Sequence, residues 1–197
     1  MKKLIAIALI AGFAAPAFAG NVKQPTVEPQ VMTPAPAPAP TYVNWTGAYA
    51  GATLGFGRAT WTGGNSKTAA GGALHGGYNM DMGTWVTGVE LSVAPGFDQT
   101  IGGREINWAA AVRGRAGPKF GDEGRFWGFG TLGVAHVNHD AVGGGDTRST
   151  NGLVAGVGVS HLMQSNMILT GEVLHSRSRG GANVNATGLA LGASLRF

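Results

Sequence analysis

Apolar residues alternate with small or polar ones through most of residues 45–197. In the first such stretch the apolar positions are Ala48, Ala50, Ala52, Leu54 and Phe56. Successive side chains of a β-strand point to opposite faces, so this period of two predicts a strand with two different faces. The pattern recurs in seven further stretches, whose apolar positions include Leu74, Val89, Val112, Leu132, Val157, Leu169 and Leu191. The chain is therefore predicted to form eight strands.

The predicted connections between the strands alternate in length. Residues 79–83 and 163–166 form short turns and residues 117–124 an intermediate one, whereas four connections are longer, polar and glycine-rich: residues 62–68, 95–103, 140–149 and 177–183. Short turns at one end and long loops at the other are typical of barrels of the bacterial outer membrane. An even number of strands places both chain termini at the short-turn end, which faces the periplasm.

The two faces of the predicted strands differ in charge. The apolar face carries none, whereas the opposite face carries Glu90, Glu105, Arg113, Arg115, Glu172 and Arg196. A soluble barrel has an apolar interior, so an uncharged exterior around a charged interior indicates a membrane barrel. The predicted fold class is all-β: an eight-stranded antiparallel up-and-down transmembrane β-barrel.

The six charged residues are predicted to lie in the lumen. An eight-stranded interior is just wide enough for side chains to fill, and desolvated charges are tolerated when opposite charges pair. We therefore expect a salt-bridged network that mostly plugs the lumen; a gated ion path through the same residues is the alternative. Glycines on the inner face are expected to make room for large neighbours such as Tyr49, Trp127 and Phe129.

Aromatic residues flank the predicted short turns and the chain ends. Such residues form girdles at the membrane interfaces of outer-membrane barrels. The predicted periplasmic girdle consists of Trp45, Tyr78, Trp85, Phe126 and Phe197, and the best candidates for the outer girdle are Phe56 and Trp108.

The first 43 residues have a different composition. Lys2 and Lys3, the apolar run of residues 4–15 and the small-residue site at Ala17-Phe18-Ala19 describe a secretory signal peptide over residues 1–19. Residues 20–43 alternate proline with alanine near their end, which favours polyproline II and predicts a semi-rigid periplasmic tether. A contact of this tether with a periplasmic or cell-wall partner is the alternative. The barrel domain is predicted over residues 44–197.

The composition and residue order argue against several other classes of function. The 197 residues include no cysteine, so disulfides, thiol catalysis and cysteine zinc sites are excluded. The net charge of +4 is small and scattered, which argues against nucleic acid. His175 and Ser176 are adjacent and would point to opposite faces of a strand, so they cannot form a Ser–His pair there. We expect no enzyme activity, catalytic residue, cofactor or metal site.

Several segments together resemble the opacity-like outer-membrane β-barrel proteins of alphaproteobacteria, small porin-family barrels related in architecture to the OmpA transmembrane domain. The matching segments are Trp45 to Gly51, Gly88-Val89-Glu90, Val112 to Gly117, Thr131 to Ala135, Gly156 to Val159, Asn166 to Glu172 and Ser194 to Phe197. Their order and spacing are fairly specific. The chain departs from the family pattern at Ser160, where an acidic residue is common, and at Pro118, which interrupts the second turn.

The resemblance implies an integral outer-membrane protein of a Gram-negative cell envelope with a structural or surface-interaction, adhesin-like role. A narrow porin-like channel for ions or small solutes is the alternative. Leu195 and Phe197 resemble the signal read by the outer-membrane assembly machinery. Other expected partners are outer-membrane lipids, a surface or periplasmic protein, and lipopolysaccharide, whose phosphates would meet the basic rim of Arg148, Arg177 and Arg179.

Overall fold

The computed structural model describes residues 42–61, 66–96, 100–101, 104–141, 148–178 and 184–197. Nine strands and one short 3-10 helix follow one another along these residues: β1 (Gly47–Trp61), β2 (Ser66–Asp81), β3 (Trp85–Pro95), β4 (Thr100–Ile101), β5 (Arg104–Phe120), η1 (Asp122–Gly124), β6 (Phe126–Ala141), β7 (Arg148–Leu162), β8 (Met167–Ser178) and β9 (Val184–Arg196). The long strands coincide with the eight stretches of alternating residues.

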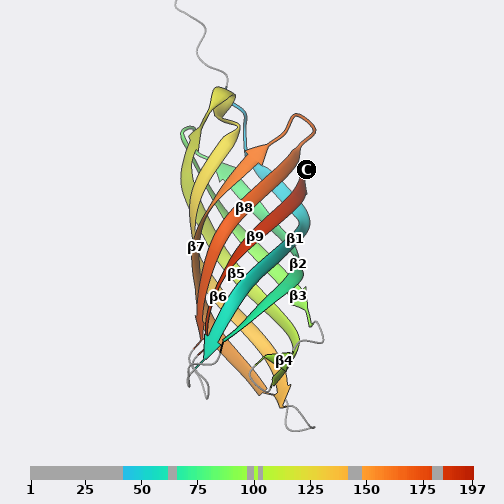
Figure 1. The fold of residues 1–197 in the computed structure, drawn as a ribbon. Coiled ribbons are helices and arrows are strands. Elements are labelled where there is room, and N and C mark those ends of the chain that lie inside the picture. The colour runs from blue at the N-terminus through green and yellow to red at the C-terminus, as the bar shows by residue number, and fades with distance from the viewer. Residues whose placement is uncertain (1–41, 62–65, 97–99, 102–103, 142–147, 179–183) are drawn as a thin grey trace, which may run out of the picture. The chain divides into compact units, whose positions relative to one another are not determined.

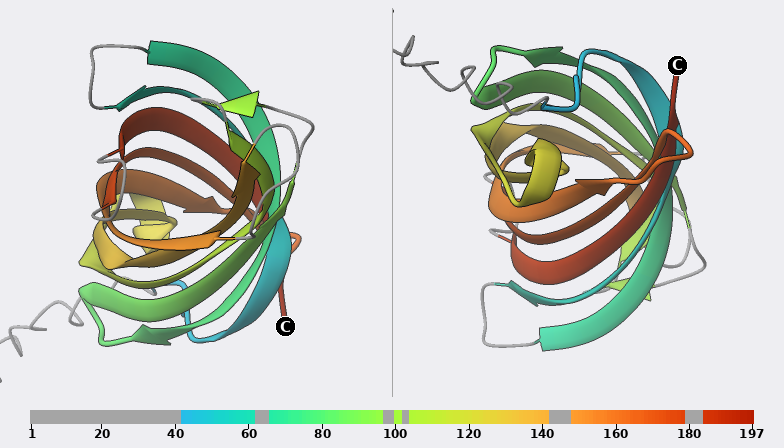
Figure 2. Two further views of the ribbon diagram at one scale, coloured as in Figure 1. Left: turned by 90° about the horizontal axis from the view of Figure 1, so that it is seen from below. Right: turned by 90° about the horizontal axis from the view of Figure 1, so that it is seen from above.

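The strands close on themselves. Each long strand pairs antiparallel with the long strand that follows it along the chain, and β1 also pairs with β9, so the ring has no free edge. The two-residue β4 pairs with the start of β5. Viewed along its length, the barrel is a closed ring (Figure 2). The predicted eight-stranded antiparallel barrel is confirmed.

Each long strand shows its apolar side chains on the outside. Leu54 is 74% exposed, Leu132 66% and Val157 65%, whereas Tyr49 and Glu90, on the alternate positions, are 4% and 5% exposed. The predicted assignment of faces therefore holds, and a slip of one residue would have exchanged them. The register shifts once, at a bulge between Ile106 and Trp108.

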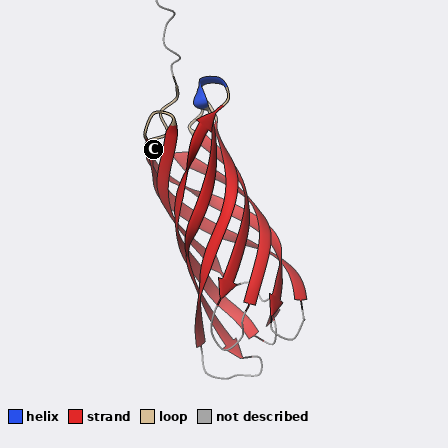
Figure 3. Cartoon of the chain, turned by 90° about the vertical axis from the view of Figure 1, so that its left-hand side faces the viewer, coloured by secondary structure: helices blue, strands red, loops and turns tan. Residues whose placement is uncertain are grey.

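The strands tilt against the long axis of the barrel (Figure 3). The C-terminus and η1 lie at one end, and β4 lies at the other (Figure 1). The turns between β2 and β3, β5 and β6, and β7 and β8 are short, and we call the end that holds them the short-turn end. Among the described residues, no helix has the length and apolar character needed to cross a bilayer.

The second turn is shorter than predicted. Pro118 was expected in this turn, but it lies within β5, faces outward and pairs with Trp85 of β3. Proline lacks a backbone N–H, so it removes one donor from the ladder without ending the strand. The next residue, Lys119, restores the pairing by donating its backbone N–H to the Thr84 carbonyl at 2.8 Å.

Some predictions fall outside the described residues. They are the signal peptide over residues 1–19, nearly all of the tether over residues 20–43, and Arg179. Glu105 belongs to β5 and Arg148 to β7, but their side chains are not described.

Candidate functional site

Four of the predicted lumen charges form one buried cluster. Arg113 and Arg115 of β5 both contact Glu90 of β3, the latter through Nη1 and Oε2 at 2.6 Å. Arg113 also contacts Glu172 of β8, across the lumen, at 3.0 Å between Nη2 and Oε1. All four side chains are 7% exposed or less. Two acids and two bases leave the cluster without net charge, which is the condition for burying it.

Neighbouring side chains hold this cluster in position. Tyr49 of β1 donates its hydroxyl to Glu90 Oε2 at 2.9 Å and accepts from Arg115 Nη1 at 3.1 Å. The Arg115 guanidinium carbon lies 4.0 Å from the ring centroid of Phe129 and 4.9 Å from that of Trp127. Cations are attracted to aromatic faces, so the rings partly replace the water that Arg115 has lost.

Glycines provide the space for these large side chains, as the sequence predicted. A Cβ atom on Gly158 would lie 2.5 Å from Phe129 Cζ and 2.8 Å from Glu172 Cβ. A Cβ atom on Gly77 would lie 2.6 Å from the Tyr49 hydroxyl oxygen. Glycine at these inward positions therefore leaves space for the large side chains of the cluster.

A second, apolar layer of buried residues lies in the lumen toward the short-turn end. Trp45 and Trp127 meet edge to face, with ring centroids 5.7 Å apart. The apolar layer consists of Trp45, Tyr49, Val86, Trp127, Phe129, Leu162 and Ile168. Trp45 was predicted in the aromatic girdle, and that assignment is wrong: its side chain is 0% exposed, and Nε1 donates to the Gly124 carbonyl at 2.9 Å. It shares the odd, inward-facing parity of Tyr49, a signal that the sequence already carried.

Residues 42–46, which we call the strap, are attached to the short-turn end by a contact that the sequence analysis missed. Lys119 of β5 donates Nζ to both carboxylate oxygens of Asp81 at 2.8 and 2.9 Å. The Trp45 backbone N–H donates to Asp81 Oδ2 at 2.9 Å. The Val43 N–H donates to the Glu123 carbonyl at 2.8 Å. The strap thus runs across the short-turn end and inserts Trp45 into the lumen.

A polar contact forms on the other face of the charged cluster. His75 of β2 shares hydrogen bonds with Thr53 at 2.9 Å and with Ser194 at 2.7 Å. These three residues belong to β2, β1 and β9, so the hydrogen bonds connect three adjacent strands on one side of the lumen.

Arg196 does not join the charged cluster. Its guanidinium donates to the Asn44 carbonyl and, at 3.0 Å, to Asn166 Oδ1 in the turn between β7 and β8. It faces inward, as predicted, but at the short-turn end, where it attaches the last strand to that turn. The side chain of Glu105, the remaining predicted member, lies outside the described side chains.

The other predicted girdle residues face outward near the short-turn end. Tyr78, Trp85, Phe126 and Phe197 are between 37% and 76% exposed. Phe120 adds a further ring, which stacks on Phe126 with centroids 5.6 Å apart. The sequence predicts a turn over residues 117–124 and therefore does not place Phe120 in the girdle, whereas β5 extends to Phe120.

Several buried polar atoms in the lumen have no partner among the described residues. They are Nε and Nη1 of Arg113, Nε of Arg115, Oε2 of Glu172 and Nε1 of Trp127. The described residues contain no group of three acidic or histidine side chains placed to hold a metal ion. Their histidines are divided between the wall and the lumen: His136 and His175 face outward, and His75 faces inward. The geometry therefore offers a crowded, charge-balanced interior.

An apolar outer wall around a buried charged interior defines the class of protein as a transmembrane β-barrel. The chain belongs to the outer membrane protein beta-barrel domain family, whose model matches residues 5–197. No curated protein matches it by sequence.

A solved structure shows the same fold, and two others are similar to the chain. Neisserial surface protein A matches with a TM-score of 0.56 at 16% identity, over 77% of this chain and 98% of that chain. Ail of Yersinia pestis matches with a TM-score of 0.49 at 18% identity, over 76% and 99%. The N-terminal barrel domain of Pseudomonas aeruginosa OprF matches with a TM-score of 0.47 at 13% identity, over 76% and 98%.

Proposed function

We propose that this protein is a structural or surface-interaction barrel of the outer membrane, adhesin-like in role, whose lumen is mostly plugged by its own side chains. The observation that carries the proposal is the stacking of two buried layers inside one narrow barrel. The cluster of Glu90, Arg113, Arg115 and Glu172 lies against the apolar layer that Trp45 completes. An open channel of eight strands would need this interior to be empty.

Electrical recording tests the plug directly. The full chain, folded in detergent and inserted into a planar bilayer, is expected to give no discrete conductance steps. A matched variant that removes two rings of the apolar layer, Trp45→Ala with Trp127→Ala, is expected to give small steps or noise. Regular steps in the unmodified protein would overturn the plug.

A narrow channel for ions or small solutes is the second candidate. The unpaired atoms of Arg113, Arg115 and Glu172 favour it, because buried polar groups without protein partners are commonly satisfied by water. A hydrated path would make conductance depend on the cluster. Arg113→Met should then change ion selectivity in the bilayer recording, whereas a plugged barrel stays silent in both forms.

The same proposal places both chain ends in the periplasm, with a signal peptide over residues 1–19 and a tether over residues 20–43 before the strap. The short turns at the C-terminal end support this orientation, since outer-membrane barrels have short periplasmic turns. The chain has no cysteine, so single cysteines report topology cleanly. On whole cells, Ser149→Cys should react with an impermeant maleimide, and Ser165→Cys should react only after the outer membrane is opened.

The remaining parts of the proposal concern kinship and partners. The opacity-like subtype rests on the motifs that span residues 45–197. Assembly through Leu195 and Phe197 is supported by their outward exposure of 57% and 76% at the end of the last strand. A surface role requires the long connections at the β4 end to face outward. Replacing residues 142–147 with a short serine linker should reduce adhesion of cells to a matrix polymer while the barrel still folds.

A further inference from the structure

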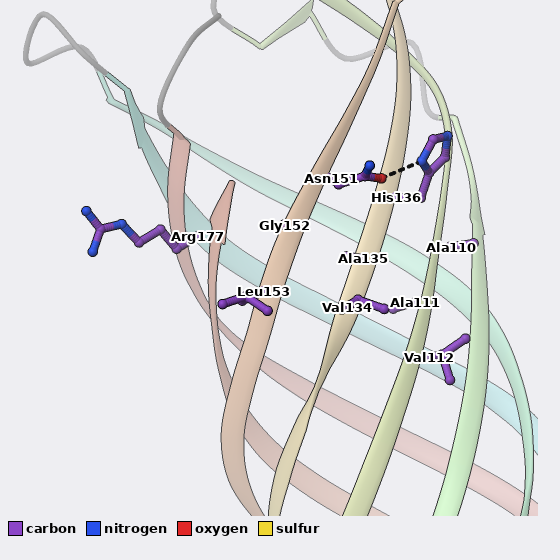
Figure 4. A pocket seen from close by; sticks show the side chains of 10 residues that line it. All are labelled: Ala110, Ala111, Val112, Val134, Ala135, His136, Asn151, Gly152, Leu153 and Arg177. Atoms are coloured by element: carbon purple, nitrogen blue, oxygen red, sulfur yellow. Dashed lines mark hydrogen bonds between the residues drawn. The ribbon is translucent and has the colours of Figure 1, made fainter. Parts of the chain in front are cut away.

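The outer wall of the barrel has a groove of about 700 Å³ on the side formed by β5, β6, β7 and β8. Its lining includes Ala110, Val134, His136, Asn151, Leu153 and Arg177 (Figure 4). Ala111 pairs with Ala135 and Ala135 pairs with Gly152, and this row has the inward parity of Arg113, so it borders the groove with backbone atoms. The groove therefore lies between two outward-facing rows, Val112–Val134–Leu153 and Ala110–His136–Asn151, over the backbone of this inward-facing row.

The groove changes from apolar to polar along its length. Val112, Val134 and Leu153 face outward and are 53% to 60% exposed. One step further toward the β4 end, His136 Nδ1 and Asn151 Oδ1 lie 2.7 Å apart, in hydrogen-bond contact. The His136 ring also lies 5.4 Å from the ring of Trp108, a residue typical of a membrane interface. The groove thus crosses the level at which acyl chains give way to headgroups.

Arg177 makes the β8 side of this groove cationic. It lies on an outward position of β8 opposite Leu153, and its side chain extends away from the wall (Figure 4). No described residue pairs with its guanidinium. Among the described side chains, no acidic group neutralises the site: Glu172 of β8 is in the lumen, β7 has no acidic residue, and Asp140 of β6 accepts a hydrogen bond from Asn107 at 2.8 Å.

We propose that this groove binds one phosphorylated, acylated lipid of the outer leaflet. An acyl chain lies along Val112, Val134 and Leu153, and a phosphate of the headgroup meets Arg177. The pair of His136 and Asn151, in the next outward row toward the β4 end, provides hydrogen bonds to the headgroup. The inference rests on the proposed orientation, because only then does the polar end lie in the outer leaflet.

A second groove on the wall shows why charge decides the occupant. It measures about 510 Å³ and is lined by Leu54, Gly55, Phe56, Ala70, Gly71, Gly72 and Leu191, without one polar side chain. The cation next along β1, Arg58, already donates to Ser66 Oγ. An acyl chain alone has no reason to prefer either groove, whereas a phosphorylated lipid is attracted to the one that carries Arg177.

The test measures lipid retention on the full chain folded in detergent micelles. Native mass spectrometry follows binding of bisphosphorylated lipid A, of its dephosphorylated form, and of soluble glucosamine phosphate. Two variants address the groove: Arg177→Gln removes the cation, and Ala110→Leu fills the space without changing charge. Two matched variants address the second groove: Arg58→Gln and Ala70→Leu. Heat-modifiable gel mobility verifies that every variant is folded.

The unmodified protein is expected to retain one bisphosphorylated lipid A. Arg177→Gln and Ala110→Leu should each weaken binding about tenfold, while Arg58→Gln and Ala70→Leu leave it unchanged. Equal retention of the dephosphorylated lipid would overturn the phosphate contact, and equal loss in all four variants would overturn the groove as the site. Displacement by glucosamine phosphate alone would show an anion site and not a lipid site. None of these results depends on conductance, so they test the lipid site and not the plug.

Discussion

Arg115 of β5 and Glu90 of β3 are diagonal neighbours on adjacent strands, and they meet inside the barrel at 2.6 Å between Nη1 and Oε2. Glu90 also contacts Arg113, its direct partner across the β3–β5 ladder. One carboxylate thus serves two guanidinium groups, while Glu172 serves only one of them. Glu90 is therefore the residue on which the charge balance of the cluster depends most.

Glu90→Gln is expected to destabilise the barrel. The amide keeps the size of the side chain, but two buried arginines then face one carboxylate. Breaking a buried pair in this way costs about 3–5 kcal/mol. The measurement is the urea midpoint of the folded barrel in detergent, followed by gel mobility. The control is Glu123→Gln, since Glu123 is 58% exposed in its pair with Arg125 and such pairs contribute below about 1 kcal/mol. Equal midpoints for the two variants would contradict the structural importance of the cluster.

Trp45→Ala tests whether the strap belongs to the barrel. Trp45 is fully buried, and removing a buried tryptophan ring costs about 3–5 kcal/mol. We expect a lower urea midpoint, measured by circular dichroism, and a smaller change for Trp85→Ala, whose side chain is 51% exposed on the outer wall. An unchanged midpoint in Trp45→Ala would mean that the strap leaves before the barrel unfolds.

The sequence predicted which face of a strand each side chain occupies far better than its position along the barrel axis. Lipid requires an apolar exterior, so period-two alternation assigns inside and outside from local residues alone. The height of a side chain along the lumen depends on strand tilt and stagger, which involve the whole ring. Parity therefore placed Arg196 inside correctly but could not show that it lies at the short-turn end, away from Arg113.

The misplaced residues near the strand ends have a different cause. The position of Trp45 before a strand favours the girdle, whereas its parity places it inside. A proline at position 118 usually marks a turn, so the sequence does not predict that Lys119 belongs to a strand. The contact between Arg113 and Glu172 joins β5 with β8, which are not neighbours in the ring. Composition shows that such charges must be paired, but only the closed barrel shows which pairs form.

Lys119→Met should loosen the strap. It removes the bidentate contact to Asp81 and leaves that buried carboxylate with only two backbone N–H donors, from Trp45 and Gly83. Amide hydrogen exchange at Val43 and Trp45 is expected to become faster, because local opening controls exchange there. Adding Asp81→Asn should cause little further change, since residues in one contact are not additive. Additive effects of the two substitutions would contradict the contact.

Phe197→Ala separates assembly from stability. The side chain is 76% exposed, and the backbone N–H still donates to the Ala48 carbonyl at 2.9 Å. The refolded barrel should therefore keep its stability to within about 0.5 kcal/mol. The amount of folded protein in the outer membrane of cells should fall, whereas Leu191→Ala, on the same outer face of β9, should leave it unchanged. Equal yields for both variants would remove Phe197 from the assembly signal.

Gly158→Ala tests the space inside the lumen with a single methyl group. The added Cβ would lie 2.5 Å from Phe129 Cζ and 2.9 Å from the Gly171 carbonyl oxygen, and the backbone atom cannot move aside without bending β8. Overpacking of this kind costs about 1–3 kcal/mol, measured as the urea midpoint in detergent. Gly130→Ala is the matched control, because a Cβ there meets no atom within 4 Å on the outward-facing side of β6. Restricting the unfolded chain should leave that variant neutral or slightly more stable. Equal midpoints for the two substitutions would mean that the lumen has room to spare, and the plug would lose its tight packing as a physical basis.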